Sequence, residues 1–209
     1  IYQIQKDTKE RVSNIIVMGM GEPLDNYEEL LRFIKLVSCE KGIGISQRNI
    51  TVSTCGLVDK IRMLADEKLQ ITLAISLHAP NDEIRRQTMP IANRYTIGEI
   101  IQACKYYFDK TGRRITFEYS MIRGVNDKEE HAKELAGRLS GLNCHINLIP
   151  LNEVKERNCY RSTKEDIEKF KTILEKYRKT VTIRREMGSD IDAACGQLRK
   201  KFLTKNGRN

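Results

Sequence analysis

Hydrophobic residues along the chain fall into short runs typical of β-strands, separated by longer stretches with helical spacing. Each short run is mainly apolar or alternates apolar and polar residues, and each is bounded by polar residues or glycine. The six runs are residues 14–20 (NIIVMGM), 49–56 (NITVSTCG), 71–78 (ITLAISLH), 114–122 (RITFEYSMI), 145–151 (HINLIPL) and 180–186 (TVTIRRE). The pattern predicts six strands.

The stretches between these runs repeat apolar residues every three or four positions, which predicts amphipathic helices. One helix is expected to bury Leu30, Leu31, Ile34 and Val37, and another Ile97, Ile100, Ile101 and Cys104. A third opens with a Ser162-x-x-Glu165 capping box, and its apolar face comprises Ile167, Phe170, Leu174 and Tyr177. Asn126 and Asp127 are expected to cap a helix that runs through Leu135 and Leu139.

Strands that alternate with helices at intervals of some tens of residues indicate an α/β fold with a parallel sheet. Right-handed crossovers then leave two architectures open, a doubly wound sheet or a barrel. We expect one domain over residues 1–198, followed by a basic tail over residues 199–209.

Composition limits the class of protein. The 209 residues are 40% hydrophobic, which suits a globular domain with an ample core, and no run is long enough to span a membrane. The first residues lack the apolar segment of a signal peptide, so a cytoplasmic location is expected. The net charge of +9 fits a polyanionic partner such as RNA, or a solvated basic surface.

The six cysteines contain no C-x-x-C pair and show no metal-site spacing. A reducing compartment is the simplest setting, and Cys104 and Cys144 are expected in the core. Cys195 lies among small residues in GSDIDAACGQL, residues 188–198. A cysteine in such a setting can be a buried filler, a metal ligand or a nucleophile.

Polar or glycine-rich loops follow nearly every predicted strand. In β/α folds such loops share one rim, where ligands bind. In GMGEP, Gly21 allows close backbone approach and Glu22 can hold a cation, although a simple turn closed by Pro23 also explains the motif. Its spacing does not match a dinucleotide-binding G-x-G-x-x-G.

Polar residues also lie in or beside the loops that follow the other predicted strands. Ser53 and Thr54 could contact a ligand or cap the following helix. His78, beside Ser76, is expected to be a hydrogen-bonded rim residue and not a metal ligand. Asn152 is a polar residue at a strand end with no structural explanation.

Together, the motifs GMGEP, STCG, SLHAPND, MPI followed by RY, GVND, INLIPLN and DIDAACGQL occur in an order that resembles one family. These are the radical-SAM adenosine methyltransferases of the RlmN family, which methylate C2 of an adenine in 23S ribosomal RNA and in some transfer RNAs. The match runs from about residue 14 to residue 198. A relative that methylates C8 of the same base resembles the chain around DIDAACGQL.

The resemblance implies a partial (β/α) radical-SAM-type barrel that binds S-adenosylmethionine at its rim. The positions that match the cofactor-binding motifs are Gly21, Glu22, Ser53, Ser76, Leu77, His78 and Asn152. Cys195 matches the family's methyl carrier, whose thiolate takes a methyl group from S-adenosylmethionine. A second S-adenosylmethionine, cleaved at a 4Fe-4S cluster, yields the radical that activates this methyl group. Flavodoxin or ferredoxin then serves as electron donor.

The sequence departs from the family in one important respect. The C-x-x-x-C-x-x-C loop that holds the cluster is not found in these 209 residues, and the first cysteine, Cys39, is predicted to lie in a helix. The chain is therefore expected to be the C-terminal part of a longer protein, inactive alone and prone to dimerise through an exposed sheet edge.

Two other classes of function remain open. A non-catalytic RNA-binding remnant would use its C-terminal basic residues, which are Arg184, Arg185, Arg199 to Lys201, Lys205 and Arg208. The second alternative is an unrelated β/α-barrel enzyme that acts on a phosphate-bearing substrate. The chain has no Gly-rich loop at the start of a helix to bind a phosphate, which argues against this alternative.

Overall fold

The computed structural model describes residues 1–151 and 160–185. In this part of the chain, six parallel strands form one sheet in the sequential order β1-β2-β3-β4-β5-β6. The strands are β1 (Ile15–Val17), β2 (Ile50–Thr54), β3 (Thr72–Ser76), β4 (Ile115–Met121), β5 (Cys144–Pro150) and β6 (Thr180–Ile183). All six predicted strands are confirmed.

The described residues form seven α-helices, of which the first precedes β1 and the others lie between consecutive strands. They are α1 (Tyr2–Thr8), α2 (Tyr27–Ser38), α3 (Val58–Asp66), α4 (Asp82–Thr88), α5 (Ile97–Thr111), α6 (Glu129–Arg138) and α7 (Lys164–Lys176). Short 3-10 helices are η1 (Pro23–Asn26), η2 (Gln47–Asn49) and η3 (Pro90–Asn93). Helix α1 was not predicted, and it contains no buried residue.

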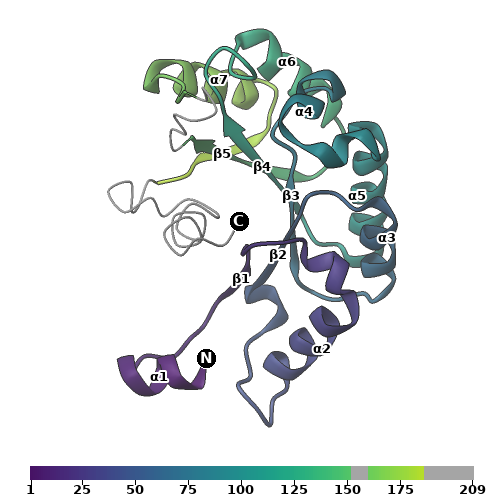
Figure 1. Cartoon of the computed structure of the whole chain (residues 1–209), viewed down its shortest axis with the longest axis vertical. Helices are drawn as coiled ribbons and strands as arrows, with labels where there is room; N and C mark the ends of the chain where they lie inside the picture. Colours follow the sequence, from purple (N-terminus) through teal and green to yellow (C-terminus); the bar gives the residue numbers. More distant parts are fainter. Residues whose placement is uncertain (152–159, 186–209) are drawn as a thin grey trace, which may run out of the picture.

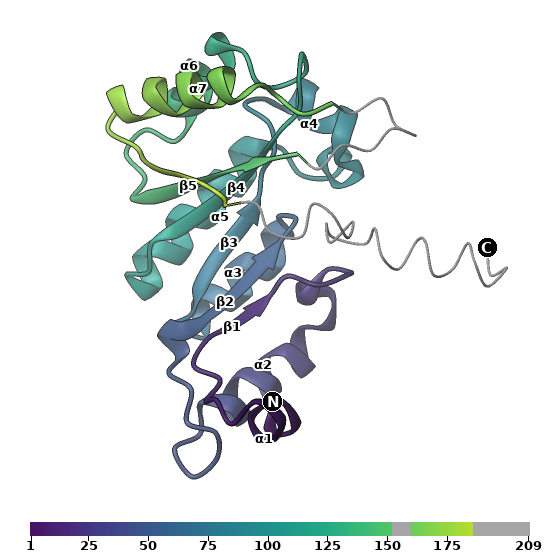
Figure 2. The same ribbon diagram turned by 90° about the vertical axis from the view of Figure 1, so that its left-hand side faces the viewer.

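The sheet is a partial barrel and not a doubly wound sheet. Because the strand order never reverses, every right-handed crossover leaves its helix on the same face of the sheet. Figures 1 and 2 show helices α2 to α7 along the convex side of a curved sheet, with the concave side on the opposite face. The expected partial (β/α) barrel is confirmed.

Side chains that alternate along each strand separate the two faces of the sheet. In β4, the fully buried Ile115, Phe117 and Tyr119 face the helices, and the Tyr119 ring lies 5.3 Å from that of Phe170 in α7. The residues between them face the concave side. Cys104 and Cys144 are buried in the core, as predicted.

The helical faces follow the sequence prediction closely. The buried residues of α2 include Leu30, Leu31, Ile34 and Val37, and those of α5 include Ile97, Ile100, Ile101 and Cys104. In α7, Ile167, Phe170 and Leu174 are buried, but Tyr177 is 52% exposed because it lies at the C-terminal cap, where the helix ends. Cys39 likewise lies just past α2, at its C-terminal cap, and not within a helix.

Two predicted helix caps are wrong. Helix α7 is capped by Thr163, whose hydroxyl accepts a hydrogen bond from the Asp166 backbone N–H, 3.1 Å away. Ser162 instead donates to Asp127 at 2.7 Å. Asn126 and Asp127 do not cap α6, which begins after Lys128. Their side chains bond to neighbouring loops, which outweighs the local capping preference.

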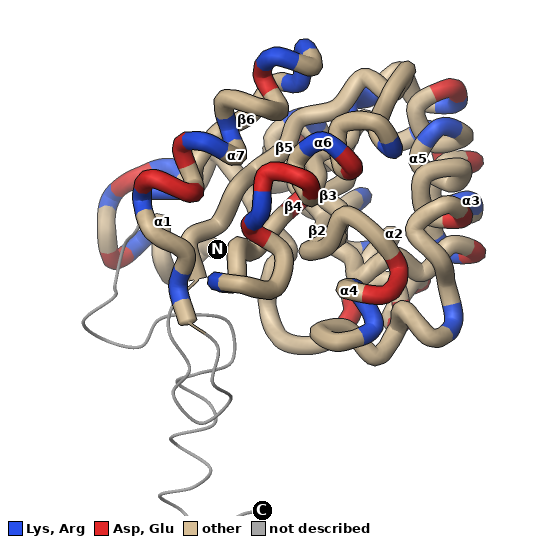
Figure 3. Tube along the Cα trace, turned by 90° about the horizontal axis from the view of Figure 1, so that it is seen from above, with Lys and Arg blue, Asp and Glu red and all other residues tan. Residues whose placement is uncertain are grey.

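Basic and acidic residues both lie on the outer helices of the described part of the chain. Figure 3 shows lysines and arginines interspersed with acidic residues over the outer helices. The described residues contain no helix long and apolar enough to cross a lipid bilayer.

Candidate functional site at the carboxyl rim of the sheet

Polar side chains gather at the carboxyl ends of β1, β2 and β3. Glu22 follows β1, Ser53 lies in β2, and Ser76 ends β3 just before Leu77 and His78. Ser53 pairs in register with Ala74, which shares a sheet face with Ser76. The two serines therefore point to the same, concave, side of the sheet, as the strand-end prediction requires.

Glu22 is anchored by backbone groups from two loops. Its carboxylate accepts hydrogen bonds from the Leu24 N–H at 3.0 Å and from the Cys55 N–H at 2.7 Å. The first bond caps η1, in which Pro23 occupies the first turn. GMGEP can therefore form a turn closed by Pro23 and still bind a ligand, because each Glu22 carboxylate oxygen has a second lone pair available for a cationic group.

Gly21 adopts a positive φ of 91°, a conformation that favours glycine. A Cβ at this position would meet no heavy atom of residues 1–151 and 160–185 within 4 Å, so these residues leave space beside the backbone of Gly21. Neither Ser53 nor Thr54 caps α3, whose N-cap is Leu57. The buried Thr54 hydroxyl accepts a hydrogen bond from the Gly56 N–H at 3.1 Å, so capping is ruled out for both residues.

His78 is held in one orientation by three backbone and side-chain contacts. Its Nδ1 accepts a hydrogen bond from the Ser120 N–H at 3.0 Å, and its carbonyl accepts one from the Asn126 amide at 2.8 Å. Its backbone N–H donates to the Glu118 carbonyl at 3.2 Å. Because Nδ1 is an acceptor, the ring proton resides on Nε2, which makes His78 a neutral donor.

Burial, together with the charge of Arg85, lowers the pKa of His78 from 6.5 to about 4. The unfolded chain therefore binds a proton before the folded protein does as the pH falls, and stability is lost from about pH 6.5 down to about pH 4. We expect the loss to reach about 2 kcal/mol at this partly open rim.

The contribution of His78 to the pH dependence can be isolated with His78→Asn. Asparagine tolerates the positive φ of 58° at this position, and its carbonyl can replace Nδ1 as acceptor. Urea unfolding of both proteins between pH 7 and pH 4 should show a shallower decline for the variant. Parallel pH profiles would contradict the assignment.

The structure adds two rim residues that sequence reasoning missed. Glu118 of β4 is 6% exposed and accepts a hydrogen bond from Asn147 of β5 at 2.8 Å. Burial raises the pKa of the Glu118 carboxyl. Ser76, Glu118 and Asn147 occupy one register row across three strands. The available signal in the sequence was a carboxylate and an amide within strands β4 and β5, at positions that face the concave side of the sheet.

Asn126 is another residue that sequence reasoning missed, and its side chain binds the backbone beside the rim residues. It is fully buried, and its amide nitrogen donates to the carbonyls of His78 and Ser120, each at 2.8 Å. Its side-chain oxygen accepts a hydrogen bond from the Ile122 N–H at 2.7 Å. Asn126 thus connects the loops after β3 and β4. Asn152 and Cys195, both predicted site residues, lie outside the described residues.

A curved parallel sheet with helices on one face defines a β/α-barrel protein, a class that binds ligands at the carboxyl rim, where these donor and acceptor groups lie. The sequence profile of the Radical SAM superfamily matches residues 1–136. The chain therefore belongs to the radical SAM superfamily.

Sequence identity to curated relatives supports this assignment. The chain is 62% identical over 203 residues to a probable dual-specificity RNA methyltransferase RlmN from Lachnospira eligens, and 60% identical to one from Lachnoclostridium phytofermentans. These alignments cover 97% and 98% of this chain but 58% of each relative. The chain thus spans just over half the length of these curated relatives, and the expected resemblance to RlmN is confirmed.

Solved structures give the same result for the fold. A radical SAM methyltransferase from Sphaerobacter thermophilus superposes with a TM-score of 0.89 at 47% identity, covering 93% of this chain and 57% of that chain. A domain of a pyruvate-formate lyase-activating enzyme from Bacteroides vulgatus superposes with a TM-score of 0.62 at 21% identity, which supports the fold alone.

The superfamily implies S-adenosylmethionine and a 4Fe-4S cluster, and the rim residues fit the first of these groups. Glu22 offers a carboxylate for an ammonium group, and Ser53, Ser76 and His78 offer hydroxyl and N–H donors for carboxylate or ribose oxygens. The open space beside Gly21 gives a ligand access to this carboxylate.

The described cysteines do not fit a cluster. Cys39 is exposed, Cys55 is half-buried, and Cys104 and Cys144 are buried. Burial raises the pKa of the Cys55 thiol to about 12 and also raises that of Cys144, which disfavours the thiolate that a cluster requires. No three His, Cys, Asp or Glu side chains within residues 1–151 and 160–185 are grouped to hold a metal ion.

Proposed function

We propose that this chain is the half-barrel part of an RNA methyltransferase that methylates C2 of an adenine in 23S ribosomal RNA and in transfer RNA. The observation that carries the proposal is its identity of 60% and 62%, over nearly the whole chain, to relatives named as dual-specificity RNA methyltransferases. The proposal includes a cytoplasmic location, where these RNAs are found, and flavodoxin or ferredoxin as electron donor to the longer protein.

When bound, S-adenosylmethionine supplies the methyl group in this proposal. Glu22 binds its ammonium group, with Gly21 allowing close approach. Ser53, Ser76 and His78 bind its carboxylate and ribose oxygens, and Leu77 lies between the last two in the chain. Asn152 is proposed as a further contact from its sequence position alone.

Cys195 is proposed as the methyl acceptor. Its thiolate forms a bond to the methyl carbon while the sulfonium C–S bond breaks, which leaves S-adenosylhomocysteine and a methylated cysteine. Its neighbours in the sequence, Ala193, Ala194 and Gly196, are small residues. The choice of C2 over C8 rests on GMGEP and LHAPND.

The decisive experiment uses the protein at the full length of its relatives. We expect it to methylate C2 of adenine, detected by mass spectrometry of digested 23S and transfer RNA, and to lose this activity completely with Cys195→Ala. Cys39→Ala, an exposed cysteine at the end of α2, should leave activity intact. RNA binding without methylation by the unaltered protein would instead support a binding remnant, and 8-methyladenine would assign the C8 reaction.

These 209 residues alone are expected to be inactive. Anaerobic reconstitution with iron and sulfide should give no broad sulfur-to-iron charge-transfer absorption, because the sequence has no C-x-x-x-C-x-x-C loop. A spectrum that corresponds to one 4Fe-4S cluster per chain would contradict this expectation.

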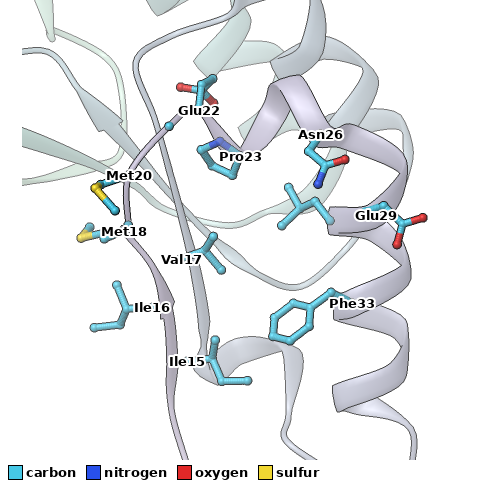
Figure 4. A pocket seen from close by; sticks show the side chains of 13 residues that line it. Ile15, Ile16, Val17, Met18, Met20, Glu22, Pro23, Asn26, Glu29 and Phe33 are labelled. Atoms are coloured by element: carbon cyan, nitrogen blue, oxygen red, sulfur yellow. The ribbon is translucent and has the colours of Figure 1, made fainter. Parts of the chain in front are cut away.

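The β1 edge of the sheet is proposed to mediate self-association. β1 is the terminal strand of the described sheet, and its residue Ile16 is 66% exposed. A groove of about 580 Å³ lies between β1 and α2, with Ile15, Val17 and Phe33 in its wall (Figure 4). An open, apolar edge strand can pair with a second copy.

Light scattering at high concentration should therefore detect a dimer of the 209-residue chain. Ile16→Lys, which charges the edge, should restore the monomer. A monomer for the unaltered chain at every concentration would overturn the proposal.

A further inference from the structure

Arg85 of α4 is an arginine with no exposed surface, held by carbonyl oxygens. Its Nη2 donates to the Cys55 carbonyl at 2.6 Å and to the Ser76 carbonyl at 3.4 Å. Its Nε donates to the Leu77 carbonyl at 3.2 Å, and its Nη1 donates to the Tyr95 carbonyl at 3.4 Å. One planar group thus binds the ends of β2 and β3 and the segment that precedes α5.

The peptide groups that Arg85 holds are those beside the rim residues. The Cys55 peptide is fixed on both sides, because its N–H donates to Glu22 and its carbonyl accepts from Arg85. Ser76 and Leu77, whose carbonyls accept from the same guanidinium, lead directly into His78. Arg85 therefore binds backbone carbonyls in the segments after β2 and β3 directly, and it is connected to the loop after β1 through the hydrogen bond between Cys55 and Glu22.

A buried guanidinium needs a physical reason, because desolvation opposes it and accordingly lowers the pKa of Arg85. Within the described part of the chain, carbonyl oxygens and not carboxylates occupy its donors. An apolar side chain would fill the space at lower desolvation cost. What arginine adds is five N–H donors in a fixed planar fork, which can hold several carbonyls at defined angles.

We infer that Arg85 is a positioning residue that holds the loops after β1, β2 and β3 in the arrangement required for binding at the rim. The inference rests on the proposed binding of S-adenosylmethionine there. The alternative is that Arg85 only stabilises the fold, in which case its loss would lower stability without a specific effect on the rim.

Two variants separate these roles. Arg85→Lys keeps the charge but loses the planar fork, and Arg85→Gln removes the charge while keeping one planar donor group. Tyr107→Phe is the matched control, since it removes a buried hydrogen bond, from the Tyr107 hydroxyl to the Ile71 carbonyl, at the opposite end of β3.

Calorimetry with S-adenosylmethionine, at a temperature where circular dichroism shows each protein folded, should give about tenfold weaker binding for Arg85→Lys. Hydrogen exchange of the Cys55 amide, which donates to Glu22, should accelerate by about tenfold in the same variant. Tyr107→Phe should leave both quantities within about twofold of the unaltered protein.

The two measurements distinguish the possible failures. If the unaltered chain does not bind S-adenosylmethionine, the proposed cofactor site fails, and hydrogen exchange alone decides the role of Arg85. If Arg85→Lys and Tyr107→Phe show the same Cys55 amide exchange rate and, where binding is measurable, the same affinity for S-adenosylmethionine, the positioning role is overturned. If Arg85→Lys does not fold, the same two measurements on Arg85→Gln decide the role of Arg85. Because Arg85→Gln removes a charge that lowers the pKa of His78, NMR should also show that the His78 ring titrates above about 4 in this variant.

Discussion

Replacing Glu22 with glutamine is expected to weaken the binding of S-adenosylmethionine roughly 100-fold, or about 2.7 kcal/mol. The carboxylate is the charged acceptor proposed for the ammonium group, and the variant loses that charge. In the unaltered protein, the N–H groups of Leu24 and Cys55 donate to the two carboxylate oxygens at 3.0 and 2.7 Å. In the variant, the glutamine N–H₂ group would face one of these N–H groups, so that one hydrogen bond is lost. Isothermal titration calorimetry measures the change directly.

Glu29→Gln provides the matched control for this prediction. Glu29 lies in α2 along the same edge groove, and its side chain is 62% exposed and 3.8 Å from Arg32. The same chemical change there should leave the affinity unaltered, because exposed ion pairs of this kind contribute little. Equal affinities for both variants would remove Glu22 from the site.

Replacing Gly56 with alanine is expected to destabilise the fold by about 3 kcal/mol. Gly56 has a φ of 101°, which an L side chain rarely adopts. A Cβ at this position would lie 2.8 Å from the Cδ1 atom of Ile100, a buried residue of α5, and 3.5 Å from Arg85 Nη2. Both the backbone conformation and the packing therefore oppose the added methyl group.

Gly137→Ala should have the opposite effect. Gly137 lies within α6 and is exposed, and a Cβ there would meet no heavy atom of the described residues within 4 Å outside the backbone of its own helix. Alanine there is expected to stabilise the fold by about 0.5 kcal/mol through helix propensity. Urea denaturation of the two variants measures both changes, and a stable Gly56→Ala protein would show that the β2–α3 turn can adopt another conformation.

Local patterns were sufficient to predict most of the architecture. Strand and helix positions followed from the runs around Ile50 and Ile115 and from the periodic faces of α2, α5 and α7. These patterns are reliable because each apolar face must be buried somewhere, whatever its neighbours are. The errors lay at helix ends and in the unpredicted helix α1. Two predicted caps were wrong because Ser162 and Asn126 bind partners distant in the sequence that no local rule specifies.

The sequence by itself determined the alternating β/α elements, the rim position of Glu22, Ser53, Ser76 and His78, and the resemblance to RlmN. The hydrophobic pattern left a doubly wound sheet and a partial barrel open, and the resemblance to RlmN implied the barrel. The tertiary structure established the barrel through its sequential strand order, which is set by packing between distant segments. It also revealed Arg85, Glu118 and Asn126 as neighbours of the rim. Their hydrogen bonds include ones to residues 29, 30 and 48 positions away in the chain, separations over which sequence patterns carry no information about contact.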